Sequence, residues 1–456
     1  MKNNKNIVII GGGLPGLIGA LLLKKIYKNV YLIEQNKKLG GLFRSRNLYK
    51  NLKFDYGSHF IKETGIKIVD QIIFGKLNKK KWHVLGNLRG ASFFKNKLND
   101  FSSNIDLRLL PPNIYKYAIT EIIKKKKKKK FSNLRDQIKH NFGNILLKKI
   151  FEPIISKKSY GCSLKDLNIN AHSYFGLDRV MAFNHEKTIE IKKQKYFDNI
   201  FAFHNYFEGQ SENKSIYPVK GGSGFIVDRL VKQLKLKKIK ILTNTKITNL
   251  ELKAKKIESI TLNGKRILTC DKLIWTLPPS IFLNYISKKI QNVPNQKFYV
   301  SLHHFAFSTN YLIKSEYLNC HDPKMKTYRI TMYSNIKRQK NDNIRSTNNP
   351  KLFHLTVEAV QPTKVNLSNL QKTILKEIFQ MNVVSRKSKV KFKYSEYLGK
   401  GIPTPTVSNF NSSKKTFNYL QKRLKNLIFT NNSLKGNSTG QLIDNIYNMY
   451  QNEKKR

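Results

Sequence analysis

Apolar positions near the start of the chain change from a continuous run to a helical repeat. Residues 6–10 (NIVII) form a short, nearly uninterrupted apolar run, which is typical of a strand buried on both faces of a parallel sheet. Between Leu14 and Leu22 the apolar residues recur at intervals of three and four, which predicts a helix with one buried face. Residues 30–33 form a second apolar run, so the pattern predicts a strand–helix–strand unit of an α/β protein.

Glycines at fixed spacing lie between the first predicted strand and the helix. Gly11, Gly13 and Gly16 form the pattern G-x-G-x-x-G, with Leu14 and Pro15 in its variable positions. In such a turn the first glycine permits the tight turn, the second lets the backbone approach a pyrophosphate, and the third lets the helix pack closely on the sheet. The N–H groups and the dipole at the helix start favour an anion. These five residues are therefore predicted to bind a dinucleotide.

An acidic residue ends the second predicted strand. Glu34 lies 23 positions after Gly11 and is followed by Gln35. A carboxylate at this place accepts hydrogen bonds from a ribose and repels a 2′-phosphate, which disfavours NADP. A glycine-rich turn in an ordinary α/β unit does not explain the acid, so we predict that Glu34 and Gln35 belong to the dinucleotide site.

A second glycine pair, Gly40 and Gly41, follows in the stretch EQNKKLGGLFRS. This stretch resembles the E-x5-GG extension of the FAD-dependent amine oxidase, protoporphyrinogen oxidase and UDP-galactopyranose mutase superfamily. The resemblance implies a non-covalently bound FAD that contacts Gly41 and Leu42, with Arg44 at its phosphates. Leu42 and Phe43 separate Arg44 from the glycine pair, whereas in many amine oxidases the arginine follows directly.

The resemblance also implies a fold and a division of the chain. It implies an α/β protein in which a Rossmann-type FAD-binding domain, with a parallel sheet as in glutathione reductase, is intertwined with an α+β substrate domain. We predict that residues 1–90, 215–290 and 400–456 form the FAD-binding domain. Residues 91–214 and 291–399 are predicted to form the substrate domain.

A third segment resembles the part of this superfamily that passes the flavin ring. Residues 54–60 (FDYGSHF) resemble its D-x-G-x-H/W segment, beside the isoalloxazine ring. The resemblance implies that Gly57, Ser58 and His59 contact the cofactor or the substrate. The alternative is that His59 is a structural residue, as a lone histidine commonly is.

Two later regions resemble the superfamily less specifically. Residues 217–224 (YPVKGGSG) resemble its Pro-x-x-GG segment, which opens a helix, and the resemblance places the backbone of Ile247 near the adenine. Residues 426–432 (NLIFTNN) resemble a C-terminal strand whose final acid contacts FAD, with Asn432 standing where that acid is expected. A final helix is predicted from about Gln441.

Few catalytic side chains are expected, because the cofactor carries the chemistry in flavin enzymes. His59 is one candidate, and Lys297 is the other, since many amine oxidases place a lysine near flavin N5 on a comparable strand. We predict an FAD-dependent oxidoreductase that transfers a hydride from a small-molecule substrate to flavin N5. One alternative is a UDP-galactopyranose mutase-like isomerase of cell-surface polysaccharide synthesis, although Tyr160 stands where that enzyme has a tryptophan. Another is a basic binding protein that keeps the nucleotide fold without catalysis.

Charge and cysteine content limit the partners and the compartment. Lys and Arg number 86 against 28 Asp and Glu, a net charge of +58, but they are spread over the chain and form no nucleic-acid-binding motif. We predict no specific nucleic-acid partner. The seven lysines from Lys124 to Lys130 favour either a solvated helix face or peripheral contact with an anionic membrane. Three distant cysteines predict neither a disulfide framework nor a metal site, and they favour the cytoplasm.

Overall fold

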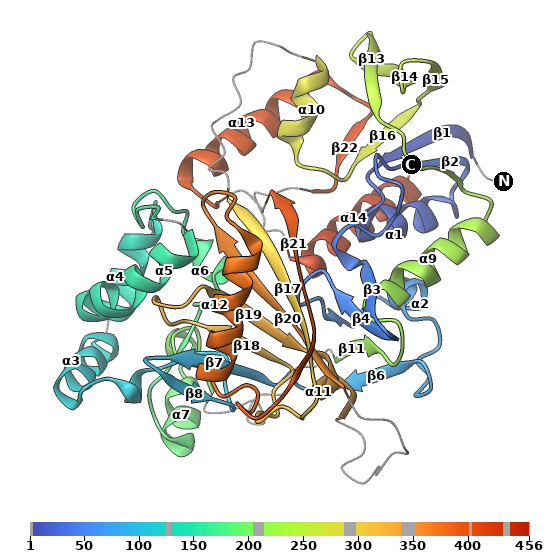
Figure 1. Ribbon diagram of the computed structural model, residues 1–456. Coiled ribbons are helices and arrows are strands. Elements are labelled where there is room, and N and C mark those ends of the chain that lie inside the picture. The colour runs from blue at the N-terminus through green and yellow to red at the C-terminus, as the bar shows by residue number, and fades with distance from the viewer. Residues whose placement is uncertain are drawn as a thin grey trace.

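The computed structural model describes residues 3–124, 129–159, 161–203, 214–286, 298–338, 352–400, 404–431 and 438–455. Two large sheets organise the chain, one parallel and one mixed, and helices pack around both (Figure 1). The last helix lies beside the first one, and both chain termini lie near the parallel sheet (Figure 1).

The parallel sheet has five strands in the order β12-β2-β1-β16-β22. Their bounds are Asn3–Ile10 (β1), Tyr27–Ile33 (β2), Lys240–Leu242 (β12), Lys272–Trp275 (β16) and Leu427–Phe429 (β22). Ile7 and Ile9 enter the core on one face and Val8 and Ile10 enter the core on the other, so β1 is buried on both sides. This arrangement confirms the α/β fold with a parallel sheet that the N-terminal pattern predicts.

Helices cover one face of the parallel sheet, and a small sheet and two helices cover the other. The first face packs against α1 (Leu14–Leu23), α2 (Lys67–Ile73), α9 (Gly224–Leu236) and α14 (Thr439–Lys455). The second packs against α10 (Pro279–Ile286), α13 (Val407–Arg423), and the antiparallel strands β13 (Ile247–Lys253), β14 (Lys256–Leu262) and β15 (Arg266–Thr269). Asn263 and Gly264 both have positive φ in the tight turn after β14, where the Asn-Gly pair predicts a turn.

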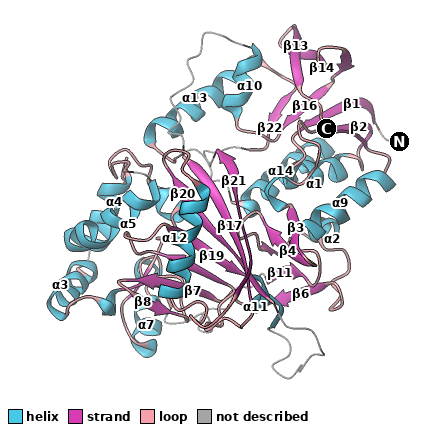
Figure 2. Cartoon of the chain, in the orientation of Figure 1, coloured by secondary structure: helices cyan, strands magenta, loops and turns pink. Residues whose placement is uncertain are grey.

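The mixed sheet has seven strands in the order β21-β17-β20-β19-β18-β7-β8, all antiparallel neighbours except β18 and β7. The strands are β7 (Gly90–Phe94), β8 (Lys97–Asn99), β17 (Tyr299–Phe307), β18 (Tyr317–Cys320), β19 (Thr327–Met332), β20 (Phe353–Gln361) and β21 (Val390–Lys400). Helix α12 (Leu367–Gln380) lies across one face and buries Leu370, Ile374 and Ile378 against it (Figure 2). The short helix α11 (Tyr333–Arg338) follows β19.

Two small sheets join the large ones. One pairs β3 (Ser45–Tyr49) with β4 (Leu52–Asp55), and the other contains β5 (Ile61–Lys62), β11 (Ser215–Pro218) and β6 (Trp82–Leu85). At the end of β4, the Phe54 ring lies 5.1 Å from the rings of both His304 and His354 on the mixed sheet. Through this contact the segment of residues 54–60 packs directly onto the mixed sheet.

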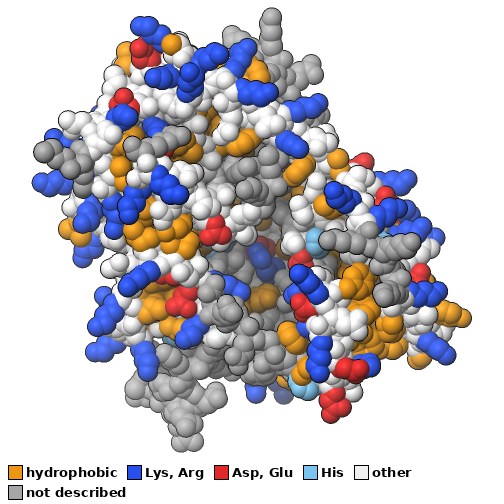
Figure 3. All heavy atoms as spheres, turned by 180° about the vertical axis from the view of Figure 1, so that it is seen from behind, with side chains coloured by type: hydrophobic (Ala, Val, Ile, Leu, Met, Phe, Trp, Pro, Cys, Tyr) orange, Lys and Arg blue, Asp and Glu red, His pale blue; other side chains and the backbone are white. Residues whose placement is uncertain are grey.

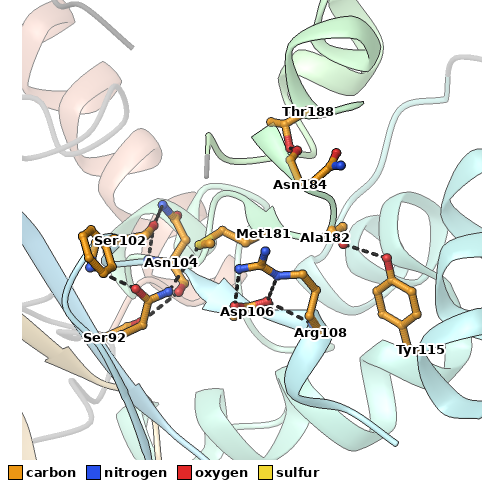
Figure 4. Close-up of polar contacts among 12 residues, drawn as sticks. Ser92, Ser102, Asn104, Asp106, Arg108, Tyr115, Met181, Ala182, Asn184 and Thr188 are labelled. Carbon is orange, nitrogen blue, oxygen red and sulfur yellow. Dashed lines mark hydrogen bonds and ion pairs between the residues drawn. The ribbon is translucent and has the colours of Figure 1, made fainter. Parts of the chain in front are cut away.

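A helical region extends from the mixed sheet. It contains α3 (Pro112–Ile123), α4 (Leu134–Leu146), a π-helical turn (Leu147–Phe151), α5 (Glu152–Ser159), α6 (Ala171–Tyr174), α7 (His185–Lys192) and α8 (Lys195–Asp198). Polar contacts tie it together around the short strands β9 (Ile105–Asp106) and β10 (Val180–Met181): Arg108 binds the Asp106 carboxylate, and the Tyr115 hydroxyl donates to the Ala182 carbonyl (Figure 4). In the described residues of this region the helices are separate, and α3 ends at Ile123 before the lysine run.

The described surface is basic, without one dominant patch in the view from behind. Lys and Arg side chains are scattered over that face among few acidic ones (Figure 3). Lys124, Lys129 and Lys130 are exposed, and residues 125–128 lie outside the described part of the chain. In that part, no helix combines the length and the apolarity needed to span a bilayer. The domain boundaries and the membrane contact stay predictions.

Candidate functional site

The turn after β1 brings the three fingerprint glycines to the start of α1. A Cβ on Gly16 would lie 1.9 Å from the carbonyl oxygen of Gly11, so only glycine lets the helix approach the end of the strand this closely. A Cβ on Gly13, in contrast, would meet only Cδ of Pro15, at 3.8 Å. Because no side chain caps the start of α1, the backbone at Gly13 faces open space at the positive end of the helix dipole.

The Glu34 carboxylate is fixed beside this turn. Its Oε2 accepts a hydrogen bond from the Gly12 N–H at 2.8 Å, and its Oε1 accepts one from the Asn36 N–H at 2.8 Å. The Glu34 N–H donates to the Leu242 carbonyl, and the Thr245 N–H donates to the Glu34 carbonyl. Thr245 lies two residues before Ile247. The acid predicted to meet a ribose therefore lies close to the start of β13, where the residue predicted near the adenine is found.

The second glycine pair lies against the first glycine turn. The Gly40 N–H donates to the Gly12 carbonyl at 2.7 Å, and Gly40 forms an isolated parallel bridge with Gly13. Gly40 and Gly41 have φ values of 109° and 55°, which favour glycine, and a Cβ on Gly41 would lie 3.4 Å from the Gly13 Cα. Two glycine-rich backbone segments thus border one open region.

Arg44 folds back over this second turn. Its Nε donates to the Gly41 carbonyl at 2.9 Å, and its guanidinium carbon lies 5.1 Å from the centre of the Tyr56 ring. Leu42 is 44% exposed and Gln35 is also exposed. These positions leave the predicted cofactor contacts of Gln35, Leu42 and Arg44 as predictions.

Asp55 joins three of the motif segments. Its Oδ1 accepts hydrogen bonds from the Ser45 hydroxyl at 2.5 Å and the Ser223 N–H at 3.0 Å, and its Oδ2 accepts one from the Tyr217 hydroxyl at 2.7 Å. Burial raises the pKa of this carboxyl, although the hydrogen bonds oppose that rise. Burial and the neighbouring Asp55 raise the pKa of Tyr217 well above its ordinary value, so the phenol remains a donor.

Glu358 and Arg329, on adjacent strands of the mixed sheet, support the segment from Gly57 to His59. Both oxygens of Glu358 accept hydrogen bonds from the Arg329 guanidinium at 2.8 Å, and Oε1 also accepts the Ser58 N–H at 3.1 Å. A Cβ on Gly57, whose φ is 107°, would lie 3.2 Å from this carboxylate. Burial opposes ionisation of Glu358, but Arg329 outweighs it and holds the pKa of Glu358 below its ordinary value.

His59 is held in this segment as a mainly neutral imidazole. Its Nε2 lies 3.0 Å from the Tyr56 carbonyl, and its ring is 5.1 Å from that of Phe43. Burial lowers the pKa of His59, Glu358 raises it, and Arg329 lowers it further. A neutral ring that donates Nε2–H to the carbonyl keeps Nδ1 as an acceptor, which is suited to binding a polar substrate or cofactor group.

Lys158, at the end of α5, is a buried cation close to the same strands. Its Nζ donates to the Phe175 carbonyl at 2.7 Å, lies 3.4 Å from His321 Nδ1, and sits 4.9 Å from the centre of the Tyr328 ring. Burial, assisted by neighbouring Lys157, lowers the pKa of Lys158 to about 7. Tyr328 precedes Arg329, so this cluster adjoins the Arg329–Glu358 pair.

The remaining candidates have different outcomes. Lys297 and Asn432 lie outside the described residues. Asn431 is described, and its Oδ1 is buried without a hydrogen-bond partner among the described residues. His303, a histidine on β17 outside these candidates, lies between the Ser301 and Ser395 hydroxyls, and burial lowers its pKa to about 3, so it is a packed residue.

Glu358, Arg329 and Lys158 are site residues that the sequence analysis missed. Glu358 is the one acid in the otherwise mostly apolar stretch FHLTVEAVQ, and such an isolated charge in a buried strand is a usable signal. Lys158 is one of many lysines in the sequence, so nothing local distinguishes it.

The parallel sheet, the paired glycine turns and the adjoining mixed sheet together define a Rossmann-like protein with a second, sheet-based part. In agreement, residues 9–70 match the family described as NAD(P)-binding Rossmann-like domain. Three solved structures have a similar fold. Reduced UDP-galactopyranose mutase shares 18% identity with a TM-score of 0.76, covering 99% of this chain and 96% of its own.

A putative protoporphyrinogen oxidase from Exiguobacterium sp. 255-15 shares 13% identity with a TM-score of 0.68, covering 100% of this chain and 99% of its own. Putrescine oxidase bound to putrescine shares 10% identity with a TM-score of 0.60, covering 100% of both chains. The fold of the chain is therefore similar to the folds of these three proteins. No curated protein sequence is significantly similar to the chain.

Proposed function

We propose that this chain is an FAD-dependent enzyme that acts on a small-molecule substrate. The observation that carries the proposal is the placement of Gly40 and Gly41 against Gly13, which leaves one open region bordered by two glycine backbones and a helix start. A dinucleotide pyrophosphate needs such a border, because its oxygens accept hydrogen bonds from free N–H groups and a Cβ would obstruct it.

The residues present fit FAD along its length. Glu34 offers its carboxylate to an adenosine ribose, and the backbone of Ile247 lies two residues beyond Thr245, which pairs with Glu34. Asp55 fixes Ser45, Tyr217 and Ser223 relative to one another, so the segment from Gly57 to His59 is held at a set position beyond the glycine turns. A bound flavin would supply the hydride and electron chemistry that side chains lack.

For the reaction class, we propose an oxidoreductase in which a hydride passes from a substrate carbon to the flavin, which would accept it when bound. In this reading, His59 and Ser58 border the substrate, and Arg329 holds Glu358 ionised beneath them. No strong general base is needed from the chain, which agrees with the lowered pKa of His59. Lys297 stays a proposed contributor near the flavin ring.

A mutase-type reaction is the second candidate. The TM-score of 0.76 to reduced UDP-galactopyranose mutase, over nearly the full length of both chains, favours it. Such an isomerase uses reduced flavin on a sugar nucleotide and consumes no net electrons.

The deciding experiment starts from the visible absorption spectrum of the purified protein, followed by dithionite titration under argon. A yellow protein that bleaches supports the proposal, and absence of flavin even after addition of FAD contradicts it. Bleaching by a candidate amine or porphyrinogen supports the oxidoreductase. Conversion of UDP-galactopyranose only after reduction supports the mutase.

A further inference from the structure

A basic groove lies on the outer side of α9, away from the open region at Gly13. It has a volume of about 970 Å³ and is bordered by α9 and residues 74–82. A second hollow of about 420 Å³ shares Lys76, Arg229 and Gln233 with it, so the two form one elongated depression. None of the motifs assigned to the dinucleotide lies in this groove.

The charge of the groove exceeds what the composition of the chain explains. Six of its fourteen lining residues are Lys or Arg and one, Asp228, is acidic, against 86 Lys and Arg in the 456 residues of the chain. Within the described residues, none of these six forms an ion pair with a carboxylate. Arg229 instead donates to the Ile73 carbonyl at 3.0 Å, so its positive charge remains unneutralised.

The floor of the groove is apolar and rigid. The Trp82 ring packs edge-on against Phe74 at 5.5 Å and Phe225 at 5.3 Å, and its Nε1 donates to the Phe74 carbonyl. Leu77 and Leu236 stand at the rim, 39% and 71% exposed. An occupant must therefore combine apolar groups for the floor and rim leucines with negative charges for the lysines.

We propose that this groove docks an acidic, amphipathic segment of a partner polypeptide. Such a segment places carboxylates opposite Lys79, Lys80 and Lys232 while its apolar side chains enter the groove, as in helix-in-groove recognition. A bilayer surface fits a concave site poorly, because membrane-binding helices insert apolar side chains that project outward. Single-stranded nucleic acid stacks its bases on exposed rings, and Trp82 is only 1% exposed.

The test titrates a fluorescein-labelled helical peptide of repeating Glu and Leu against the purified full-length protein and follows anisotropy. Triple charge reversal K79E/K80E/K232E should weaken binding by about tenfold or more, because it reverses the rim charge. The matched control K414E/K415E/K422E makes the same charge change on exposed lysines of α13 and should alter binding by less than about twofold. Flavin content and thermal stability of both variants establish that the fold and the dinucleotide site are intact.

Trp82 gives a second, direct readout. In a W275F variant it is the one remaining tryptophan of the sequence, so its emission should shift when the peptide binds. Equal losses in both triple variants, or no peptide binding, would overturn the proposal. Displacement of the peptide by inorganic pyrophosphate alone would indicate a site for small anions and would overturn the proposal. Tighter binding of phosphatidylserine vesicles or of an oligonucleotide, lost in the groove variant, would identify a different ligand and would also overturn the proposal.

Discussion

Gly13 and Gly41 lie against each other at the candidate dinucleotide site: a Cβ on Gly41 would lie 3.4 Å from the Gly13 Cα. The two glycines are 28 residues apart in the sequence and belong to separate motifs. Their contact brings the two glycine motifs together at one place, as the proposed pyrophosphate site requires.

Gly13→Val should abolish flavin binding without unfolding the protein. A Cβ at Gly13 meets only Pro15, so the folded chain tolerates the substitution, whereas the added methyl groups occupy the region predicted for the pyrophosphate. We expect FAD affinity to fall by about a hundredfold or more, measured by flavin fluorescence, with the melting temperature of the flavin-free protein nearly unchanged.

The contrasting variant is Gly16→Ala. Its Cβ would lie 1.9 Å from the Gly11 carbonyl oxygen, so we expect the free energy of unfolding to fall by about 1–3 kcal/mol. Retained FAD affinity in Gly13→Val would contradict the assignment of the open region to a pyrophosphate.

Glu34→Ala should weaken FAD binding by about ten- to a hundredfold, the effect of losing a charged hydrogen-bond acceptor. The carboxylate is already oriented by the Gly12 and Asn36 N–H groups, so a ribose would meet it without rearrangement. Glu34→Gln keeps one acceptor oxygen and should have the smaller effect. Equal FAD affinity in wild type and Glu34→Ala, measured by calorimetry, would exclude the ribose contact.

The sequence predicts those features of the structure whose interacting residues are close together along the chain. The first 34 residues contain everything needed to predict the first strand, the glycine turn, the helix and the role of Glu34. The parallel sheet follows from this strand–helix–strand unit. The Asn263-Gly264 turn is equally local. These features were predictable because each residue type is required by its own backbone position.

The support of the site was not predictable, because it joins distant segments. Ser223 reaches Asp55 across 168 residues, and Ser58 reaches Glu358 across 300. The spacing of residues in the sequence does not predict such pairs, because a carboxylate in the core can form its hydrogen bonds with residues of any neighbouring strand. The lone acid in β20 signals that a partner exists, but only the register of β19 and β20 identifies Arg329.

Arg329→Met should destabilise the protein by about 2–3 kcal/mol, because it leaves the largely shielded Glu358 carboxylate without its cation. This loss is below the range of about 3–5 kcal/mol for fully buried pairs, since the Arg329 side chain is 31% exposed and that of Glu358 is 12% exposed. Double substitution with Glu358→Gln should recover most of the loss, as measured by urea unfolding. If the double variant is as unstable as the sum of the single ones, the two groups are not coupled.

The stability of the protein should rise with pH above neutrality because of Lys158. Burial lowers the pKa of this lysine to about 7 from 10.5, so between these values the unfolded chain binds the proton that the folded protein lacks. Each pH unit in that window therefore adds up to about 1.4 kcal/mol to the free energy of unfolding. Lys158→Met removes the titrating group and should flatten the dependence between pH 7 and 10, measured by urea unfolding at each pH.

His321 provides the matched control for Lys158, which it faces across 3.4 Å. Burial and the charge of Lys158 lower the pKa of His321 well below 6.5, so its contribution to stability rises with pH only up to about that value. His321→Asn should flatten the profile below pH 6.5 and leave the slope above pH 7, whereas Lys158→Met should do the reverse. A slope above pH 7 that persists in Lys158→Met would show that Lys158 stays protonated in the folded protein.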